Sequence, residues 1–269
     1  MRGSDMELYK RIRNRREELG MSQDELAKKM GYKSRSSINK IEMGENDIPQ
    51  SKISAFAKGA RRPNSPFLAA TTPFVFGIFT LYEGRTSYNL NQVSITHHFA
   101  ELAEKQPGIY YGFYFLELAD YFGQEGTDEK DAMNLLYVTV KALLNPHIED
   151  RLIRCIFELR MMVVQGIGPS LFNCTGCGKQ PGEEEKLFFS QEAHGILCKE
   201  CLRKVKDGGR ISQSALYVMR YAAVADLGKL YTFTVKEEVL AELERFIHKY
   251  IAKNTDKKFK SLEILEIMS

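Results

Sequence analysis

The spacing of hydrophobic and polar residues changes twice along the chain. Residues 7–57 place apolar side chains three and four positions apart in several short stretches, which predicts short helices. Residues 73–83 and 86–97 are rich in Phe, Tyr, Val, Ile and Thr, which predicts two strands paired as a hairpin. From about residue 100 the helical spacing returns. The pattern as a whole predicts a mostly α-helical protein with a small β part.

The helical stretches after residue 100 are amphipathic to almost entirely apolar. Gly123, Gly126 and the Asn145-Pro146 pair interrupt them, because glycine and proline favour helix ends. The pattern predicts helices over 111–122, 131–144, 149–167, 212–228 and 235–253, followed by a short apolar tail.

The first sixty residues contain the outline of a helix-turn-helix. Ser22 and Glu25 have the spacing of a capping box, in which each side chain accepts a hydrogen bond from the other residue's backbone N–H. Gly31 ends this short helix, and Ser34 is a candidate cap for the next one. Helix, tight glycine turn and helix together are typical of a DNA-binding unit.

The second helix of such a unit enters the major groove of DNA. Arg and Asn side chains can read guanine and adenine edges there. The side of this helix opposite Ile38 and Ile41, together with nearby residues able to bind phosphate, supplies the predicted DNA-binding residues: Gln23, Lys33, Ser34, Arg35, Ser36 and Asn39. The alternative is a small helical bundle used for dimerisation or protein contact.

The charge distribution supports the DNA-binding interpretation. The net charge is only +3, but residues 1–62 hold 15 Lys and Arg against 9 Asp and Glu. The remaining residues hold 23 against 26, so a basic front precedes a slightly acidic body. An anionic partner for the front is therefore expected, most simply nucleic acid.

Four of the five cysteines form two close pairs, and they carry the strongest chemical signal. Cys174 and Cys177 are separated by twenty residues from Cys198 and Cys201, which gives two C-x-x-C motifs. Two such turns can direct four thiolates at one ion, which predicts a closed structural Zn²⁺ site. His194 could replace one ligand, although with four thiolates present it is expected to lie outside the site. The fifth cysteine, at position 155, is expected in the core.

Several classes of protein are not predicted. No apolar run is long enough to cross a bilayer, and the N-terminal arginines precede no apolar segment of a secretory signal. We therefore expect a cytoplasmic protein with no membrane partner. Glycine-rich phosphate loops, acid pairs at a known spacing and nucleophile elbows do not occur, so the sequence predicts no enzyme.

Residues 7–57 resemble the phage-repressor type of helix-turn-helix. The matching features are Ser22-Gln23 at the start of the second helix, Leu26-Ala27, Gly31, Ile38 and Ile41-Glu42. Carried over onto this chain, the recognition positions are Ser34, Arg35, Ser36 and Asn39.

Residues from about 52 to the end resemble the RecO family of bacterial recombination mediators. The motifs are "KISAFAKGARRPNSPF", "LYEGR", "LNQ", "FELRMMVVQGIGPSLFNCTGCGK" and "ILCKEC". The resemblance implies an OB-type barrel, a helical body and a zinc module. It also implies binding to single- and double-stranded DNA, strand annealing, and loading of recombinase onto strands coated by single-strand-binding protein. The implied partners are that protein's C-terminal tail and RecR, and the implied location is the bacterial nucleoid.

The chain departs from the family at its start, where the helix-turn-helix replaces the first barrel strands. The predicted domains are therefore a helix-turn-helix at 1–58, a partial OB-like segment at 59–99, and a helical domain at 100–269 with its zinc module at 174–201. The join falls in "KISAFAK", which fits a helix as well as a strand. We expect helix up to about Lys58 and extended chain from Arg61. Either the shortened barrel has an open edge, or the new domain covers it.

If the DNA path of the family is retained, Lys58, Arg61 and Arg62 are expected to carry it. They precede strands that bear aromatic residues, namely Phe74, Phe76, Tyr82 and Tyr88, and cations beside aromatic platforms suit single strands. Most of these aromatic side chains are nevertheless expected in the core. Arg85 and Lys179 are further candidates. Two functions stay open: a DNA-repair mediator, and a sequence-specific transcriptional regulator with a zinc-stabilised C-terminal module.

Overall fold

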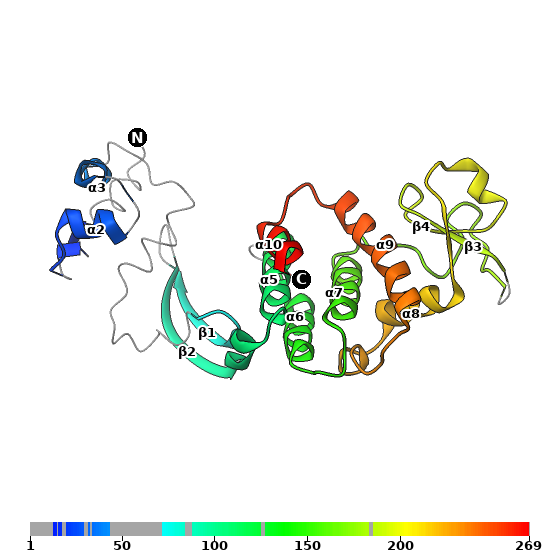
Figure 1. Ribbon diagram of the computed structural model, residues 1–269, viewed down its shortest axis with the longest axis horizontal. Coiled ribbons are helices and arrows are strands. Elements are labelled where there is room, and N and C mark those ends of the chain that lie inside the picture. Colours follow the sequence, from blue (N-terminus) through cyan, green and yellow to red (C-terminus); the bar gives the residue numbers. More distant parts are fainter. Residues whose placement is uncertain are drawn as a thin grey trace. The chain divides into compact units, whose positions relative to one another are not determined.

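The chain divides into two compact units, and each is described by itself. The computed structural model describes residues 13–14, 16–17, 20–29, 32, 34–43, 72–83, 88–124, 127–182 and 185–268. Unit 1 comprises Met1–His97 and unit 2 comprises His98–Ser269 (Figure 1). The predicted boundary at residue 58 lies outside the described residues, as does the ambiguous "KISAFAK" segment.

Two short helices of unit 1 form the predicted helix-turn-helix pair, α2 (Gln23–Lys29) and α3 (Arg35–Glu42). They pack through a small apolar cluster of Leu26, Ala27, Ile38 and Ile41. Each helix has about two turns, since α2 has 7 residues and α3 has 8.

The capping box at the start of α2 is confirmed. The backbone N–H of Ser22 donates to Glu25 Oε2 at 2.7 Å, and the N–H of Glu25 donates to Ser22 Oγ at 3.2 Å. Ser34 occupies the N-cap position of α3, but its side chain makes no capping hydrogen bond. Its hydroxyl lies 2.9 Å from that of Ser36 instead, so Ser34 holds the predicted cap position without a side-chain hydrogen bond to the helix backbone.

A two-stranded sheet follows in unit 1. It consists of β1 (Val75–Glu83) and β2 (Tyr88–His98), which confirms the predicted hairpin pairing. The aromatic side chains do not share one environment: Phe74 is buried, whereas Tyr82 is 70% exposed. The expectation of a core position is therefore right for Phe74 and wrong for Tyr82.

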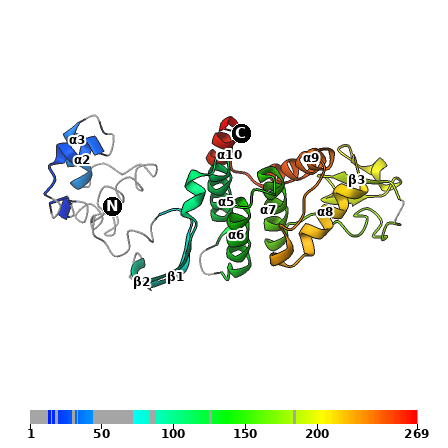
Figure 2. The same ribbon diagram turned by 60° about the horizontal axis from the view of Figure 1, so that its bottom comes forward.

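Unit 2 is built mainly of helices that run side by side (Figures 1 and 2). In chain order these are the 3-10 turn η2 (Ala100–Glu104), α5 (Gly108–Phe122), α6 (Lys130–Leu143), α7 (Asp150–Val164), η3 (Cys201–Lys204), α8 (Gln213–Val224), η4 (Leu227–Lys229), α9 (Glu237–Asn254) and α10 (Lys260–Met268). Within the described part of the chain, every helix is too short or too polar to span a bilayer.

The expected apolar tail is the helix α10, which packs against α5. Its first turn is fixed by Glu117 of α5, whose Oε2 accepts hydrogen bonds from the backbone N–H and the hydroxyl of Ser261 at 2.9 and 2.5 Å. Leu265 is buried in this contact region at 1% exposure. Because this cap comes from a helix far away in sequence, the local pattern of the tail does not predict it.

Helix α7 lies at the centre of unit 2 and is buried on most of its surface. Phe157 contacts Phe115 of α5 with ring centroids 4.5 Å apart. On the other side Arg151 bonds Glu244 of α9 at 2.6 Å and Glu237 at 3.0 Å. Apolar packing and a bidentate ion pair thus join α5, α7 and α9.

A buried carboxylate adds a polar cluster to this core. Glu158 is fully buried, and its Oε1 accepts hydrogen bonds from Tyr114 Oη and Arg154 Nε, each at 2.8 Å. Its Oε2 lies 3.6 Å from His248 Nε2. Burial lowers the pKa of His248, which outweighs the attraction of Glu158 for a proton on the ring. The ring is therefore neutral at pH 7, and Arg154 supplies the balancing charge.

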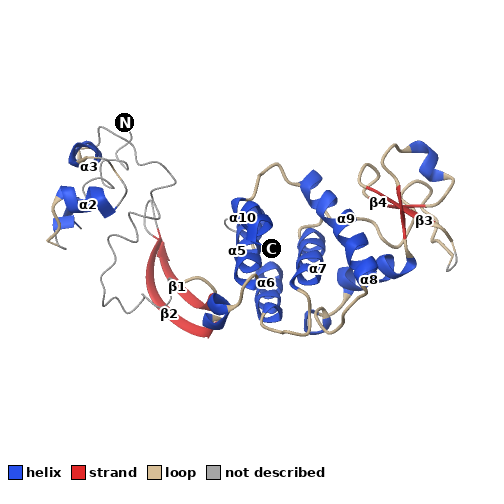
Figure 3. Ribbon diagram, in the orientation of Figure 1, coloured by secondary structure: helices blue, strands red, loops and turns tan. Residues whose placement is uncertain are grey.

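A three-stranded antiparallel sheet lies at the end of unit 2 opposite α5 and α10 (Figure 3). It consists of β3 (Leu187–Ser190), β4 (Gly195–Leu197) and β5 (Gly209–Ile211), with β3 in the middle. Phe189 of β3 contacts Phe246 and Tyr250 of α9, with ring centroids 5.3 and 5.9 Å apart. These strands are too short to show a period, and the sequence pattern did not predict them.

Replacing Glu158 should destabilise the protein strongly. Glu158→Ala leaves the Arg154 guanidinium buried without its carboxylate, which costs about 3–5 kcal/mol. We expect a large drop in the urea midpoint. Asp226→Ala is the matched control, because the Asp226–Lys229 pair is mostly exposed and should contribute little. Equal midpoints for the two variants would contradict the structural role of the buried pair.

Candidate metal centre and DNA-reading helix

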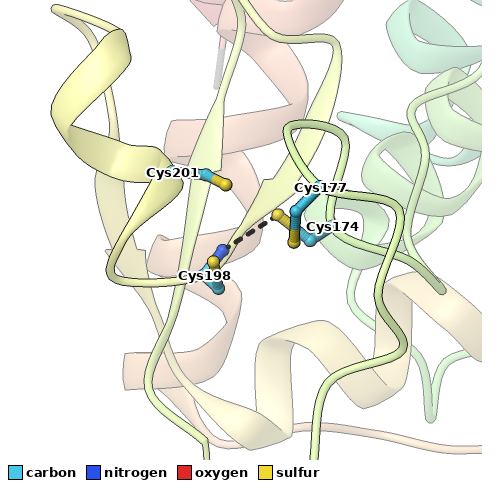
Figure 4. Close-up of side chains that lie close together, drawn as sticks. All are labelled: Cys174, Cys177, Cys198 and Cys201. Atoms are coloured by element: carbon cyan, nitrogen blue, oxygen red, sulfur yellow. Dashed lines mark hydrogen bonds between the residues drawn. The ribbon is translucent and has the colours of Figure 1, made fainter.

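The four paired cysteines converge on one point of unit 2. The sulfur atoms of Cys174, Cys177, Cys198 and Cys201 all lie within 4.8 Å of one another (Figure 4). Cys174 and Cys201 are buried, Cys198 is half-buried and Cys177 is exposed. Two turns that are separated in sequence therefore present their thiols to a shared centre.

Backbone hydrogen bonds attach the first turn to the sheet. The N–H of Thr175 donates to the carbonyl of Ile196 in β4 at 2.9 Å. The N–H of Cys198, directly after β4, donates to Cys174 Sγ at 3.3 Å. Within the turn, the N–H of Gly178 donates to the carbonyl of Cys174 at 2.7 Å. The strand thus fixes the distance between the two cysteine pairs.

Two glycines make the first turn possible, each for its own reason. Gly178 has φ = +73°, a conformation that residues with a side chain adopt rarely. Gly176 approaches the second cysteine pair so closely that a Cβ there would lie 2.7 Å from Cys201 Cβ. Both glycines are therefore required by the geometry of the turn.

The electrostatics of the cluster favour a bound cation. Burial opposes ionisation of Cys174, but the backbone N–H groups of Cys198, Cys177 and Gly176 outweigh it and lower the pKa of Cys174 to about 6. The hydrogen bond with Cys198, followed by burial, raises the pKa of Cys201 to about 12. Without a cation the thiols compete for negative charge, because adjacent thiolates repel one another.

The arrangement fits a four-sulfur metal site. Tetrahedral zinc–thiolate bonds of about 2.3 Å place sulfur atoms about 3.8 Å apart, which is compatible with the observed cluster. Cys174 and Cys201 already lie in an apolar setting with Leu197. The four thiols could therefore hold one metal ion with no ligand from outside the chain.

The other residues considered as ligands lie elsewhere. His194 is exposed, and its Nδ1 lies 3.3 Å from the hydroxyl of Tyr250 rather than among the sulfurs. Cys155 is fully buried in α7, where burial raises its pKa well above the ordinary value. Both positions agree with the sequence-based expectation.

The exposed side of α3 carries the residues predicted to read DNA. Ser34, Arg35, Ser36 and Asn39 are exposed, whereas Ile38 and Ile41 are buried. Gln23 from α2 connects two members of this set: its Oε1 accepts from Arg35 Nε and its Nε2 donates to Asn39 Oδ1, each at 3.3 Å. The turn between the helices thus brings one residue of α2 into the surface formed by α3.

A buried ion pair under this surface was not predicted. Arg16 Nε donates to Glu42 Oε1 at 2.6 Å, and Gln23 Nε2 donates to Glu42 Oε2 at 2.8 Å. The hydrogen bond with Glu42 raises the pKa of Arg16. The signal in the sequence was a cation on an apolar stripe, since Arg16 lies four residues after Ile12 and three before Leu19.

The remaining predicted DNA-binding residues cannot be located in the same way. Lys33, Lys58, Arg61 and Arg62 lie outside the described residues, and so does Arg85. Lys179 is described and exposed beside the metal centre. The proposed path along the hairpin stays a prediction.

Comparisons with known families agree with this arrangement. The model described as "Recombination protein O C terminal" matches residues 107–263, and "Recombination protein O N terminal" matches residues 50–99. A "Helix-turn-helix" model matches residues 12–61. The helix-turn-helix match overlaps the N-terminal recombination match at 50–61, which includes the segment predicted to join two domains.

Several curated relatives cover most of the chain. "DNA repair protein RecO" of Alkaliphilus metalliredigens is 31% identical over 214 residues, which are 79% of this chain and 86% of the relative. The protein of the same description from Symbiobacterium thermophilum is 30% identical and covers 81% and 87%. That of Clostridium acetobutylicum is 26% identical and covers 88% and 98%.

Fold, site and relatives together define a class: a helical body with a four-cysteine module, preceded by a helix-turn-helix and a short β segment. Within that class the chain belongs to the RecO family of DNA repair proteins.

Removing one thiol should empty the centre and loosen unit 2. Cys174→Ser or Cys198→Ser should release the metal ion and lower the thermal midpoint, because metal-binding free energy contributes to folding free energy. Cys155→Ala, which removes the buried thiol outside the cluster, should keep the metal. Metal content by mass spectrometry and calorimetry measure both effects. Unchanged metal content and unchanged stability in the Cys174 and Cys198 variants would refute the site.

Proposed function

We propose that this protein acts in recombinational DNA repair by binding DNA strands. The observation that carries the proposal is membership of the RecO family over both its N-terminal and C-terminal parts. The curated relatives are described as DNA repair proteins, which supports the same role for this chain. In this proposal the protein works on the bacterial chromosome in the cytoplasm.

The finer role that we propose is that of a mediator. The protein would bind single- and double-stranded DNA, anneal complementary strands, and help load recombinase onto strands coated by single-strand-binding protein. Its protein partners would be the C-terminal tail of that coating protein and RecR. Lys58, Arg61 and Arg62 would contact phosphates along the β segment, a binding mode that weakens steeply with salt.

The metal ion in this proposal is one structural Zn²⁺. Four thiolates complete a tetrahedral shell, and soft sulfur ligands favour zinc. A shell filled by the chain leaves no position for a substrate, which supports a binding protein rather than an enzyme. The ion would stabilise the sheet that packs against α9.

A second candidate function is sequence-specific transcriptional regulation. The observation that favours it is the exposed pair Arg35 and Asn39, whose side chains are both hydrogen-bonded to Gln23. In this alternative the zinc-stabilised unit 2 would serve as an effector or dimerisation module.

Competition binding separates the two functions. A mediator should bind a labelled single strand, release it to any unrelated single strand, and anneal complements. A regulator should instead prefer one duplex sequence over genomic duplex by orders of magnitude. Annealing by the full chain, compared with a version that carries a complete barrel, tests whether the β segment suffices. Loss of single-strand binding and annealing in both versions would exclude the mediator role.

The two DNA-binding surfaces should be separable by mutation. Arg35→Ala combined with Asn39→Ala should weaken duplex binding, with a loss of about 1–3 kcal/mol for each base contact, and should leave single-strand binding intact. Titrations of both ligands at fixed salt measure the difference. Equal losses for duplex and single strand would show that the division of roles between the helix-turn-helix and the β segment is wrong.

A further inference from the structure

The four thiols of the metal centre differ in their access to solvent. Cys177 is exposed and Cys198 is half-buried, whereas Cys174 and Cys201 are only 2% and 5% exposed. A small dissolved oxidant therefore reaches the sulfur of Cys177 more readily than the other three. Oxidation of cysteine follows exposure and thiolate character, and a thiolate is the form in which cysteine binds a metal ion.

Hydrogen bonds from the backbone also distinguish the two thiols of the first turn. The N–H of Cys198 donates to Cys174 Sγ at 3.3 Å. Within the described part of the chain, no backbone N–H donates to the sulfur of Cys177. A hydrogen bond stabilises a thiolate and lowers its nucleophilicity. Cys177 thus combines access to solvent with an undiminished nucleophile.

A second thiol lies within reach of Cys177. The N–H of Gly178 donates to the carbonyl of Cys174 at 2.7 Å, which closes the turn that carries both cysteines. Their sulfur atoms lie no more than 4.8 Å apart, and Figure 4 shows the two side chains next to each other. A disulfide needs sulfur atoms about 2.05 Å apart, so a shift of less than about 3 Å would join them. Two residues between the cysteines is also the spacing of redox-active disulfides.

We propose, on the basis of the zinc site proposed above, that Cys177 is a site of reversible oxidation by hydrogen peroxide and that Cys174 is its resolving partner. The product is a disulfide between Cys174 and Cys177. Oxidation at this exposed sulfur then controls whether unit 2 holds its metal ion.

The reaction has two steps. The thiolate of Cys177 attacks one oxygen of hydrogen peroxide, the O–O bond breaks, and a sulfenic acid and a hydroxide ion form. The thiolate of Cys174 then attacks the sulfur of the sulfenic acid, the S–O bond breaks, and a second hydroxide ion leaves. The two sulfur atoms together lose two electrons, and the peroxide gains them. Both hydroxide ions take up protons to form water.

The disulfide leaves only the second cysteine pair for the metal ion. Two sulfur ligands do not complete the tetrahedral shell of a structural zinc site, so the ion should be released. The hydrogen bond from Thr175 to Ile196 still connects the first turn to β4. We therefore expect a looser sheet but no global unfolding. A dithiol reductant with added zinc should restore the original state, because thiol–disulfide exchange is reversible.

Zinc release by hydrogen peroxide tests the proposal on the full-length protein. Metal content is measured first, so that protein without zinc would refute the site itself together with the switch. Peroxide is then added, release is followed with a zinc-binding dye, and disulfides are mapped by mass spectrometry of non-reduced peptides. We expect zinc release, a disulfide between Cys174 and Cys177, a lower thermal midpoint, and recovery with dithiothreitol and zinc.

Two histidine variants separate the roles of the sulfur atoms. Cys177→His keeps four ligands, because zinc also accepts three Cys and one His, but should release zinc about tenfold more slowly. Cys198→His is the matched control, which keeps both reacting thiols and should release zinc at about the rate of the parent protein. Cys155→Ala, which removes a fully buried thiol of α7, should leave the rate unchanged.

Several results would overturn the switch while leaving the metal site intact. These are zinc that stays bound in peroxide, a disulfide that excludes Cys177, equal release rates for the two histidine variants, and release that dithiothreitol with zinc does not reverse. If Cys177→His binds no zinc, the disulfide mapped in the parent protein decides.

Discussion

The convergence of four thiols is the constraint on which the far end of unit 2 depends. The sheet β4-β3-β5 has strands of three or four residues and could not bury enough apolar surface to be stable alone. A metal ion held by both cysteine pairs would close the loop between them, and the hydrogen bond from the N–H of Thr175 to the carbonyl of Ile196 connects that loop to β4. Phe189 of β3 in turn packs against the rings of Phe246 and Tyr250 in α9. A metal ion at this centre would thus stabilise the small sheet and its packing against α9.

In unit 1 a buried ion pair, rather than a cysteine cluster, holds short elements together. Two short helices with a four-residue core are held in register by the buried Arg16–Glu42 pair, to which Gln23 also bonds. The Glu42 carboxylate of α3 therefore binds Gln23 of α2, and Gln23 in turn bonds to Arg35 and Asn39. Since function resides in such sites rather than in folds, a helix-turn-helix can be combined with a repair-protein body in one chain. The basic excess of residues 1–62 is consistent with that combination.

The sequence predicted the features that have a local signal. The two C-x-x-C motifs, the capping box at Ser22, the hairpin and helices α5 to α9 all follow from spacing or from strong periodicity. Three features were not predicted from the sequence, because residues far apart in the chain create them. Helix α10 needs Glu117 of α5 as its cap, the strands β3 to β5 need one another, and a groove lined by Tyr217 and Tyr221 of α8 depends on the packing of Phe233 against Tyr221. The exposure of Tyr82 likewise depends on which elements surround the hairpin. The alternation of residues within a strand carries no information about those elements.

X-ray absorption at the zinc edge of the purified full-length protein tests the central claim most directly. The account predicts one zinc ion per chain with a first shell of four sulfur atoms at about 2.3 Å. A shell that contains nitrogen or oxygen in place of sulfur, or protein that holds no stoichiometric metal, would contradict it.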